Sequence, residues 1–172
     1  CIVEYGAGTG IFTREVCAKK RPDTVYIVIE QNDRFYSMLQ KQFHGVPGVV
    51  LIHGDAGNVC SFLKKQGFPH ADHIISGLPF TSLPEPVSRR ILSQTQKAVG
   101  ANGVFTTFQY TLLRRQFLEE YFNIRKIVRI WRNLPPAYVL NMKLKCSETD
   151  INVTMNGPQT AKSNINCYRE GL

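Results

Sequence analysis

Three glycines at alternate positions, preceded by an acidic residue, form the stretch with the clearest chemical meaning. It reads Glu4-Tyr5-Gly6-Ala7-Gly8-Thr9-Gly10, after an apolar run and before a pattern typical of a helix. Glycine allows positive φ and lets a ligand approach the backbone closely. A helix that follows presents free N–H groups in its first turn. The stretch therefore predicts a nucleotide pocket between a strand and a helix.

The glycine spacing distinguishes between two kinds of nucleotide. A dinucleotide fingerprint, G-x-G-x-x-G, needs a glycine at position 11, where this chain has Ile11. The pattern E-x-G-x-G-x-G instead resembles motif I of the class I S-adenosylmethionine (SAM) methyltransferases. SAM has a methionine ammonium and no pyrophosphate, so the resemblance implies that Glu4 faces this cation, directly or through water. It also implies a cofactor site lined by Gly6, Ala7, Gly8 and Gly10. An ordinary glycine-rich turn is the alternative.

An acidic residue after the second predicted strand supports the same interpretation. The β-branched, apolar run 24–29 predicts a strand buried on both faces. Glu30 follows it, 20 residues after the last glycine of the loop, close to the offset of ribose-binding acids in βαβ units. We expect Glu30, with Gln31 beside it, to bind the ribose hydroxyls. The alternative is a surface Glu that caps the next helix, although Asn32 or Asp33 can provide that cap.

The third predicted strand, 49–52, leads to a further acidic residue. Asp55 and Ala56 follow it, before a helix predicted at about 58–66. We expect both residues in the cofactor site, where Asp55 accepts from the adenine amino group. Asp55 is equally suited to cap the helix.

The second informative stretch reads Ser76-Gly77-Leu78-Pro79-Phe80 and ends the fourth predicted strand. It resembles motif IV of amine-directed methyltransferases, such as N-L-P-Y/F in the rRNA adenine dimethylases, whose Asn and backbone carbonyls accept from the target amine. Gly77 stands at the Asn position and has no side-chain acceptor, which argues against adenine. The resemblance implies a carbonyl acceptor at Leu78 and an aromatic wall at Phe80, both catalytic. It also places Ser76 beside the cofactor and Pro79 beside the substrate. A plain strand-to-helix turn is the alternative.

Further short motifs extend the resemblance from Cys1 to about Leu144. They are Leu83-Pro84, Arg89-Arg90-Ile91-Leu92, Gly103-Val104-Phe105, Phe108-Gln109-Tyr110 and Trp131-Arg132-Asn133-Leu134-Pro135-Pro136-Ala137. In this order they resemble the bacterial phospholipid N-methyltransferases, which convert phosphatidylethanolamine to phosphatidylcholine with SAM. The resemblance implies a SAM-dependent N-methyltransferase of this headgroup, with S-adenosylhomocysteine as product and no metal. The alternatives are an rRNA or other nucleic-acid adenine N6-methyltransferase, and a non-catalytic SAM-fold protein that binds anionic surfaces.

Four residues are candidates for work on the substrate. Tyr110, after the fifth predicted strand, can orient the amine or accept its proton through water, or it can simply form a wall. Arg129 and Arg132 are candidates for binding lipid phosphate, for which Arg is well suited. Trp131 is expected at the lipid interface, with core packing as the alternative.

Positive charge is concentrated in one part of the chain. The net charge is +8, and residues 89–145 hold eleven of the 21 Lys and Arg but only two of the 13 Asp and Glu. This concentration favours an anionic partner, either nucleic acid or an acidic membrane surface, and the family resemblance implies the anionic membrane surface. A solvated basic surface is the alternative. No apolar run approaches the length of a membrane span and no signal-peptide pattern is present. The cysteines favour reduced thiols in a cytoplasmic setting, and the resemblance implies peripheral association with the membrane.

Metal and disulfide sites are not indicated. His70 and His73 precede the fourth predicted strand, away from the end of a sheet where ligands bind, so we expect no metal there. The five cysteines are scattered and form no C-x-x-C pair.

The pattern of elements predicts an α/β, Rossmann-like class I methyltransferase fold. Its sheet is expected to be seven-stranded and mostly parallel with an antiparallel last strand. The later elements are a helix at 84–98 ending at Gly100, a strand at 104–108, a helix at 112–121, and a hairpin of strands 124–131 and 137–144. We assign residues 1–145 to this domain and 146–172 to a polar, flexible tail. Because the sequence begins inside a strand, we expect an N-terminal segment to be missing. In the family it covers the cofactor and touches the membrane, so the chain alone is expected to be impaired.

Overall fold

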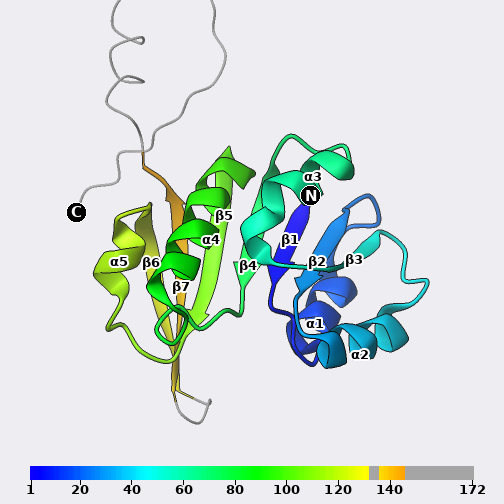
Figure 1. Ribbon diagram of the computed structural model, residues 1–172, viewed down its shortest axis with the longest axis horizontal. Helices are drawn as coiled ribbons and strands as arrows, with labels where there is room; N and C mark the ends of the chain where they lie inside the picture. Colours follow the sequence, from blue (N-terminus) through cyan, green and yellow to red (C-terminus); the bar gives the residue numbers. More distant parts are fainter. Residues whose placement is uncertain (132–135, 146–172) are drawn as a thin grey trace, which may run out of the picture.

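A single seven-stranded sheet organises the protein, in the order β3-β2-β1-β4-β5-β7-β6 (Figure 1). The computed structural model describes residues 1–131 and 136–145. Its strands are β1 (Ile2–Tyr5), β2 (Tyr26–Glu30), β3 (Val49–His53), β4 (Ala71–Ser76), β5 (Val99–Gln109), β6 (Phe122–Ile130) and β7 (Ala137–Leu144). The pairs β1–β2, β1–β4, β2–β3 and β4–β5 are parallel, whereas β7 runs antiparallel to both of its neighbours, β5 and β6. The predicted fold class and the antiparallel last strand are therefore confirmed.

Helices cover both faces of the sheet. They are α1 (Ile11–Lys19), α2 (Asp33–Phe43), α3 (Val59–Lys65), α4 (Glu85–Ala98) and α5 (Arg115–Glu119), with a 3₁₀ turn η1 (Ala56–Asn58). Alternate side chains of β2 point to opposite faces. Tyr26 and Val28 pack in one core cluster with α1 and α2, whereas Ile27 and Ile29 pack in the other with α3, α4 and α5. Burial on both faces explains why β2 is apolar up to its last residue, Glu30.

The fifth strand begins earlier than the sequence predicts. We expected a helix cap at Gly100, but α4 ends at Ala98 and the chain is extended from Val99 onward. Val99 pairs with Ala71, and the β4–β5 register then shifts. A Cβ at Gly103 would lie 3.0 Å from the Ala71 carbonyl oxygen, so this glycine permits the irregular pairing.

The helix before the hairpin is shorter than predicted at both of its ends. We expected a helix at 112–121, but α5 spans only Arg115–Glu119. Phe122 is fully buried and pairs with Leu144, so β6 begins where the predicted helix was to end. The hairpin itself is present as predicted.

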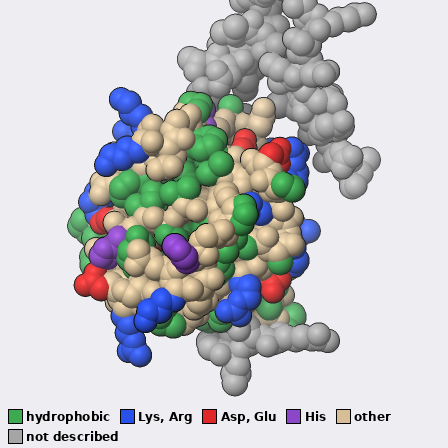
Figure 2. All heavy atoms as spheres, turned by 90° about the vertical axis from the view of Figure 1, so that its right-hand side faces the viewer, with side chains coloured by type: hydrophobic (Ala, Val, Ile, Leu, Met, Phe, Trp, Pro, Cys, Tyr) green, Lys and Arg blue, Asp and Glu red, His purple; other side chains and the backbone are tan. Residues whose placement is uncertain are grey.

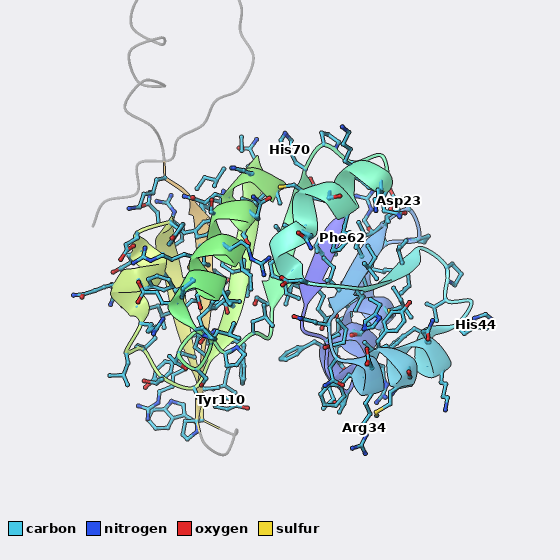
Figure 3. The ribbon with its side chains drawn as sticks, viewed as in Figure 1. Asp23, Arg34, His44, Phe62, His70 and Tyr110 are labelled. Atoms are coloured by element: carbon cyan, nitrogen blue, oxygen red, sulfur yellow. The ribbon has the colours of Figure 1, made fainter. Side chains whose placement is uncertain are left out.

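The carboxyl ends of the parallel strands lie at one edge of the sheet. Tyr110, directly after β5, lies at this edge, and His70 lies at the opposite one (Figure 3). In an α/β sheet the edge that holds the carboxyl ends is where ligands bind. Within residues 1–131 and 136–145, no helix is long and apolar enough to cross a membrane.

Candidate cofactor and substrate site

A cavity of about 720 Å³ opens at the carboxyl ends of β1, β4 and β5, a size common for small-molecule sites. The glycine loop contributes Gly6, Ala7, Gly8 and Thr9, α1 contributes Ile11 and Phe12, and β4 with its following turn contributes Ile75, Ser76, Gly77, Pro79 and Thr81. The β5 end contributes Thr106, Phe108, Gln109 and Tyr110, and the hairpin contributes Ile130 and Val139. Two motifs that are 70 residues apart in the sequence therefore meet around one cavity.

The three glycines of the loop all have positive φ, but their surroundings differ. A Cβ at Gly10 would lie 2.8 Å from the Phe43 ring and 2.9 Å from Leu39, so this glycine serves the packing of α2. A Cβ at Gly6 would lie 2.7 Å from the Leu78 side chain. Around Gly8, at φ +55°, a Cβ would meet nothing within 4 Å. Gly8 is thus the glycine whose missing side chain leaves open space at the cavity.

Glu30 ties the glycine loop to the end of β2. Its carboxylate accepts from the Gly8 N–H at 2.9 Å and from the Asn32 N–H at 2.8 Å. Asn32 caps α2 by accepting from two backbone N–H groups, so the cap falls where the sequence predicted it. A carboxylate has about four lone-pair positions. Glu30 therefore has acceptor capacity left for ribose hydroxyls, which stays a prediction.

Glu4 does not face the cavity, contrary to expectation. It is 2% exposed, and its carboxylate accepts from the Thr13 hydroxyl at 2.7 Å and from the Tyr26 hydroxyl. Burial raises its pKa, and the two hydrogen bonds oppose that shift. Because Tyr5 points towards α3–α5, its neighbour Glu4 points towards α1 and α2. Its hydrogen bonds join α1 to β2, and Glu4 does not line the cavity.

Asp55 caps η1, the alternative that the sequence left open. Its side chain accepts from the Gly57 N–H at 2.6 Å and forms an ion pair with Arg90. Neither Asp55 nor Glu30 lines the cavity, and Gln31 beside Glu30 is exposed. Ala56 is buried in the core. Contacts between these residues and a cofactor stay predictions.

The turn after β4 brings Ser76, Gly77 and Pro79 to the cavity. The Ser76 hydroxyl accepts from the Leu78 N–H at 3.2 Å. The Gly77 N–H donates to the Tyr5 carbonyl at 3.0 Å, and a Cβ at Gly77 would lie 3.0 Å from the Gly6 carbonyl oxygen. The close contact between the two loops therefore explains why a glycine occupies this position.

Phe80 and Leu78 are placed differently from the prediction. Phe80 is fully buried and packs edge-on against Phe105, so it forms core rather than a cavity wall. The Leu78 carbonyl accepts from Gln109 Nε2 at 2.9 Å and from the Phe80 N–H at 3.0 Å. A carbonyl has two lone pairs. The Leu78 carbonyl is thus already fully used by the protein, and the expected role as the amine acceptor is corrected.

Gln109 was not predicted as a site residue. It ends β5, is 4% exposed, and lines the cavity. A polar residue between Phe108 and Tyr110 at the end of an apolar strand was the available signal. Its position opposite Leu78 depends on the pairing of β5 with β4, which the local sequence does not specify.

Exposed apolar side chains contribute to the wall of the cavity. The large hydrophobic residues that are exposed in the described part of the chain are Ile11, Phe12, Tyr110, Leu113, Ile130 and Trp131. Four of these six line the cavity, and Trp131 directly follows one of them. We call the six residues the apolar rim. Tyr110, 54% exposed, stands edge-on to Phe108 as part of it.

The Arg129 guanidinium lies 3.7 Å from the centre of the Trp131 ring, a cation–π contact. Trp131 is 69% exposed and is therefore not core. Arg132 lies outside the described residues.

The basic excess is only partly available to a partner. Arg89 pairs with Glu85 and Glu120, and Arg90 and Arg115 are also in ion pairs. Five basic side chains on or next to the hairpin strands are exposed, namely Arg125, Lys126, Arg129, Lys143 and Lys145. The face that carries the β3 edge shows Lys and Arg side chains scattered singly around its border (Figure 2). The two hairpin strands contain no Asp or Glu, so these five side chains make the hairpin a cationic surface.

Comparisons with known proteins agree with this geometry. No family model matches the sequence. The chain is 29% identical over 137 residues to an ornithine lipid N-methyltransferase of Singulisphaera acidiphila, which covers 79% of this chain and 71% of that protein. It is 33% identical over 93 residues to the mycinamicin-resistance protein MyrB of Micromonospora griseorubida. That match covers 54% of this chain and 26% of that protein.

Solved structures share the fold at low identity. TrmN from Thermus thermophilus superposes with a TM-score of 0.68 at 15% identity, over 84% of this chain and 43% of that one. A SAM-dependent methyltransferase from Aquifex aeolicus gives 0.65 at 10% identity, over 82% and 80%. The chain thus spans less than half of TrmN and about a quarter of MyrB. Fold, cavity and relatives together identify the chain as a SAM-dependent methyltransferase of the class I fold, similar in sequence to a lipid N-methyltransferase.

Proposed function

We propose that this methyltransferase acts on the primary amine of phosphatidylethanolamine and methylates it towards phosphatidylcholine. The observation that carries the proposal is the apolar rim, because four of its six exposed side chains line the cavity. A headgroup amine cannot leave its bilayer, so the cavity must come to the membrane. Exposed apolar side chains gathered at a pocket are typical of such an interaction site.

The residues at the glycine loop fit SAM. The open space around Gly8 admits a ligand against the backbone, and Glu30, which holds the Gly8 N–H, offers free acceptor positions for hydroxyls. SAM supplies a methyl group on a cationic sulfonium, which is already activated. The chain therefore has to bind, align and desolvate the reactants, and alignment alone contributes much of such a rate.

The substrate side of the cavity suits a small amine. No side chain projects from Gly77, and Pro79, Gln109 and Tyr110 enclose the space beside it. The Tyr110 hydroxyl makes no hydrogen bond to a described residue. It is therefore free to orient the amine or to accept the amine's proton through a water molecule. We keep Tyr110 as the candidate for this role.

The positions of Trp131 and Arg129 support docking on a membrane surface. Trp side chains prefer the interface between lipid tails and headgroups, and the adjacent Arg129 guanidinium has the geometry to bind a lipid phosphate. The exposed cations of the hairpin add attraction to an anionic leaflet, about 1 kcal/mol for each Lys or Arg near the surface. In this arrangement the apolar rim enters the interface and the cavity opens towards the headgroups.

Methyl transfer from labelled SAM to lipid vesicles tests the proposal. The vesicles contain phosphatidylethanolamine and an anionic lipid, and parallel samples contain ornithine lipid, the substrate named for the relative, or rRNA. Gly8→Val serves as the control without cofactor binding. We expect label in methylated phosphatidylethanolamine and none in RNA.

Label in ornithine lipid alone would move the proposal to that headgroup. Label in RNA alone would refute lipid specificity.

A further inference from the structure

Gln109 is held in one orientation by two hydrogen bonds. Its Nε2 donates to the Leu78 carbonyl at 2.9 Å and to the Thr107 hydroxyl oxygen at 2.9 Å. A side-chain amide has two N–H donors, and both are used here. A carbonyl can only accept, so the group facing Leu78 must be the NH₂. The amide therefore cannot be flipped without losing that bond.

The other end of the amide has no protein partner. Oε1 accepts no hydrogen bond from a described residue. In residues 1–131 and 136–145, two side-chain atoms are both fully buried and without a partner, namely Ser88 Oγ and Arg114 Nη1. Gln109 Oε1 is not one of them. It therefore retains accessible surface. Gln109 lines the cavity beside Gly77, so this surface faces the space where a substrate amine would lie.

The chain thus has a fixed acceptor oxygen where the usual one is missing. Gly77 has no side chain, and the Leu78 carbonyl is saturated by Gln109 itself. We propose that Gln109 Oε1 accepts a hydrogen bond from the substrate amine and so aims its lone pair at the methyl group. This inference rests on the proposed function, which supplies the amine.

The chemistry is balanced without a proton on Gln109. The substrate ammonium first loses a proton to water. One N–H of the neutral amine donates to Oε1, and the nitrogen lone pair forms the new N–C bond while the C–S bond breaks and sulfur keeps its electron pair. Nitrogen becomes positively charged, and the fixed amide oxygen stabilises that charge as it develops.

The number of methyl groups already on nitrogen decides whether this contact can form. A neutral primary amine has two N–H bonds and a monomethylated amine has one, so both can donate to Oε1. A dimethylated amine has none. Gln109 should therefore accelerate the first and second transfers and contribute little to the third.

Rates with the three acceptors test this assignment. Single-turnover rates are measured for phosphatidylethanolamine and its mono- and dimethylated forms in vesicles, at saturating SAM. Gln109→Met removes the acceptor oxygen at similar side-chain length. SAM affinity is measured by calorimetry for each protein. The dimethylated lipid is the internal control, because a merely structural change would slow all three transfers alike.

We expect Gln109→Met to slow the first two transfers about 10- to 100-fold, as for a hydrogen bond to a charged group, and the third less than about threefold. Equal losses for all three lipids, or no loss, would overturn the assignment. A wild-type protein that methylates no lipid amine would overturn the proposed function and this inference with it, whereas the ratios among variants test Gln109 alone.

Discussion

Replacing either of two glycines in one loop with Ala should have different main effects. Gly10→Ala should lower the free energy of unfolding more, and Gly8→Ala should weaken SAM binding more. Gly8→Ala places a methyl group in open space, so its cost to folding is the left-handed backbone alone, at φ +55°. That cost is about 1–2 kcal/mol. Gly10→Ala has the same backbone cost, and its methyl group also meets Phe43 at 2.8 Å and Leu39 at 2.9 Å. Overpacking adds about 1–3 kcal/mol, for a total of about 2–5 kcal/mol.

For SAM affinity the order of the two variants should be the opposite, with the larger loss at Gly8. At Gly8 the new methyl group occupies space that we assign to the cofactor, and a clash of about 1–3 kcal/mol weakens binding about 5- to 150-fold. Gly8→Val, larger and branched, should abolish binding. At Gly10 the methyl group points into the contact with α2, so the folded fraction of Gly10→Ala should keep SAM affinity within a few-fold.

Urea unfolding and SAM calorimetry on both variants provide the test. The free energy of unfolding should fall more for Gly10→Ala, and the SAM dissociation constant should rise more for Gly8→Ala. A folded Gly8→Val protein that binds SAM as tightly as the wild type would refute the assignment of the cofactor to this loop.

Three further predictions concern the rest of the site. Burial raises the pKa of Glu4, so above about pH 4.3 the native state retains a proton that the unfolded chain loses. The free energy of unfolding therefore falls as pH rises from there through the raised pKa. Glu4→Gln should flatten this fall in urea unfolding measured from pH 4 to 8, and an unchanged slope would contradict the prediction. Trp131, the only tryptophan of the sequence, should shift its fluorescence to the blue and be quenched by brominated lipid tails when anionic vesicles are added. Leu113→Asp, at an apolar-rim position that is 89% exposed, should weaken this response without lowering the free energy of unfolding, and a wild-type spectrum that vesicles leave unchanged would argue against docking through the apolar rim. Tyr110→Phe should reduce the methylation rate about tenfold or less, and Tyr110→Ala should reduce it further, because the ring as well as the hydroxyl borders the cavity; equal rates for Tyr110→Phe and wild type would reduce Tyr110 to a wall.

Local pattern was sufficient for the parallel part of the fold. The run before Glu30 is apolar because both faces of β2 are covered. The glycine loop indicates the first strand-to-helix turn, because its three glycines adopt positive φ. These features depend on residues that are close in sequence. The extent of β5 was not predictable in this way, because it depends on pairing with Ala71.

The site was predictable in part for the same reason. Ser76, Gly77 and Pro79 reach the cavity because they belong to a turn whose position the fold fixes. Strand alternation could have warned that Glu4 and Tyr5 face opposite sides. The burial of Phe80 against Phe105 and the bond from Gln109 to Leu78 join segments about 25 to 31 residues apart. Their contacts are set by packing, which a motif does not describe.

The contact between Gly77 and Gly6 has a consequence for the history of the enzyme. A side chain at position 77 would press on the Gly6 carbonyl, in the loop assigned to the cofactor. Acquiring an Asn there, as in the base-modifying enzymes that this motif resembles, would therefore disturb cofactor binding before any new substrate could be used. A switch of substrate class along this route needs two coordinated changes rather than one. Directed evolution towards nucleobase methylation should accordingly stall at single substitutions of Gly77 and proceed only in libraries that also vary the glycine loop.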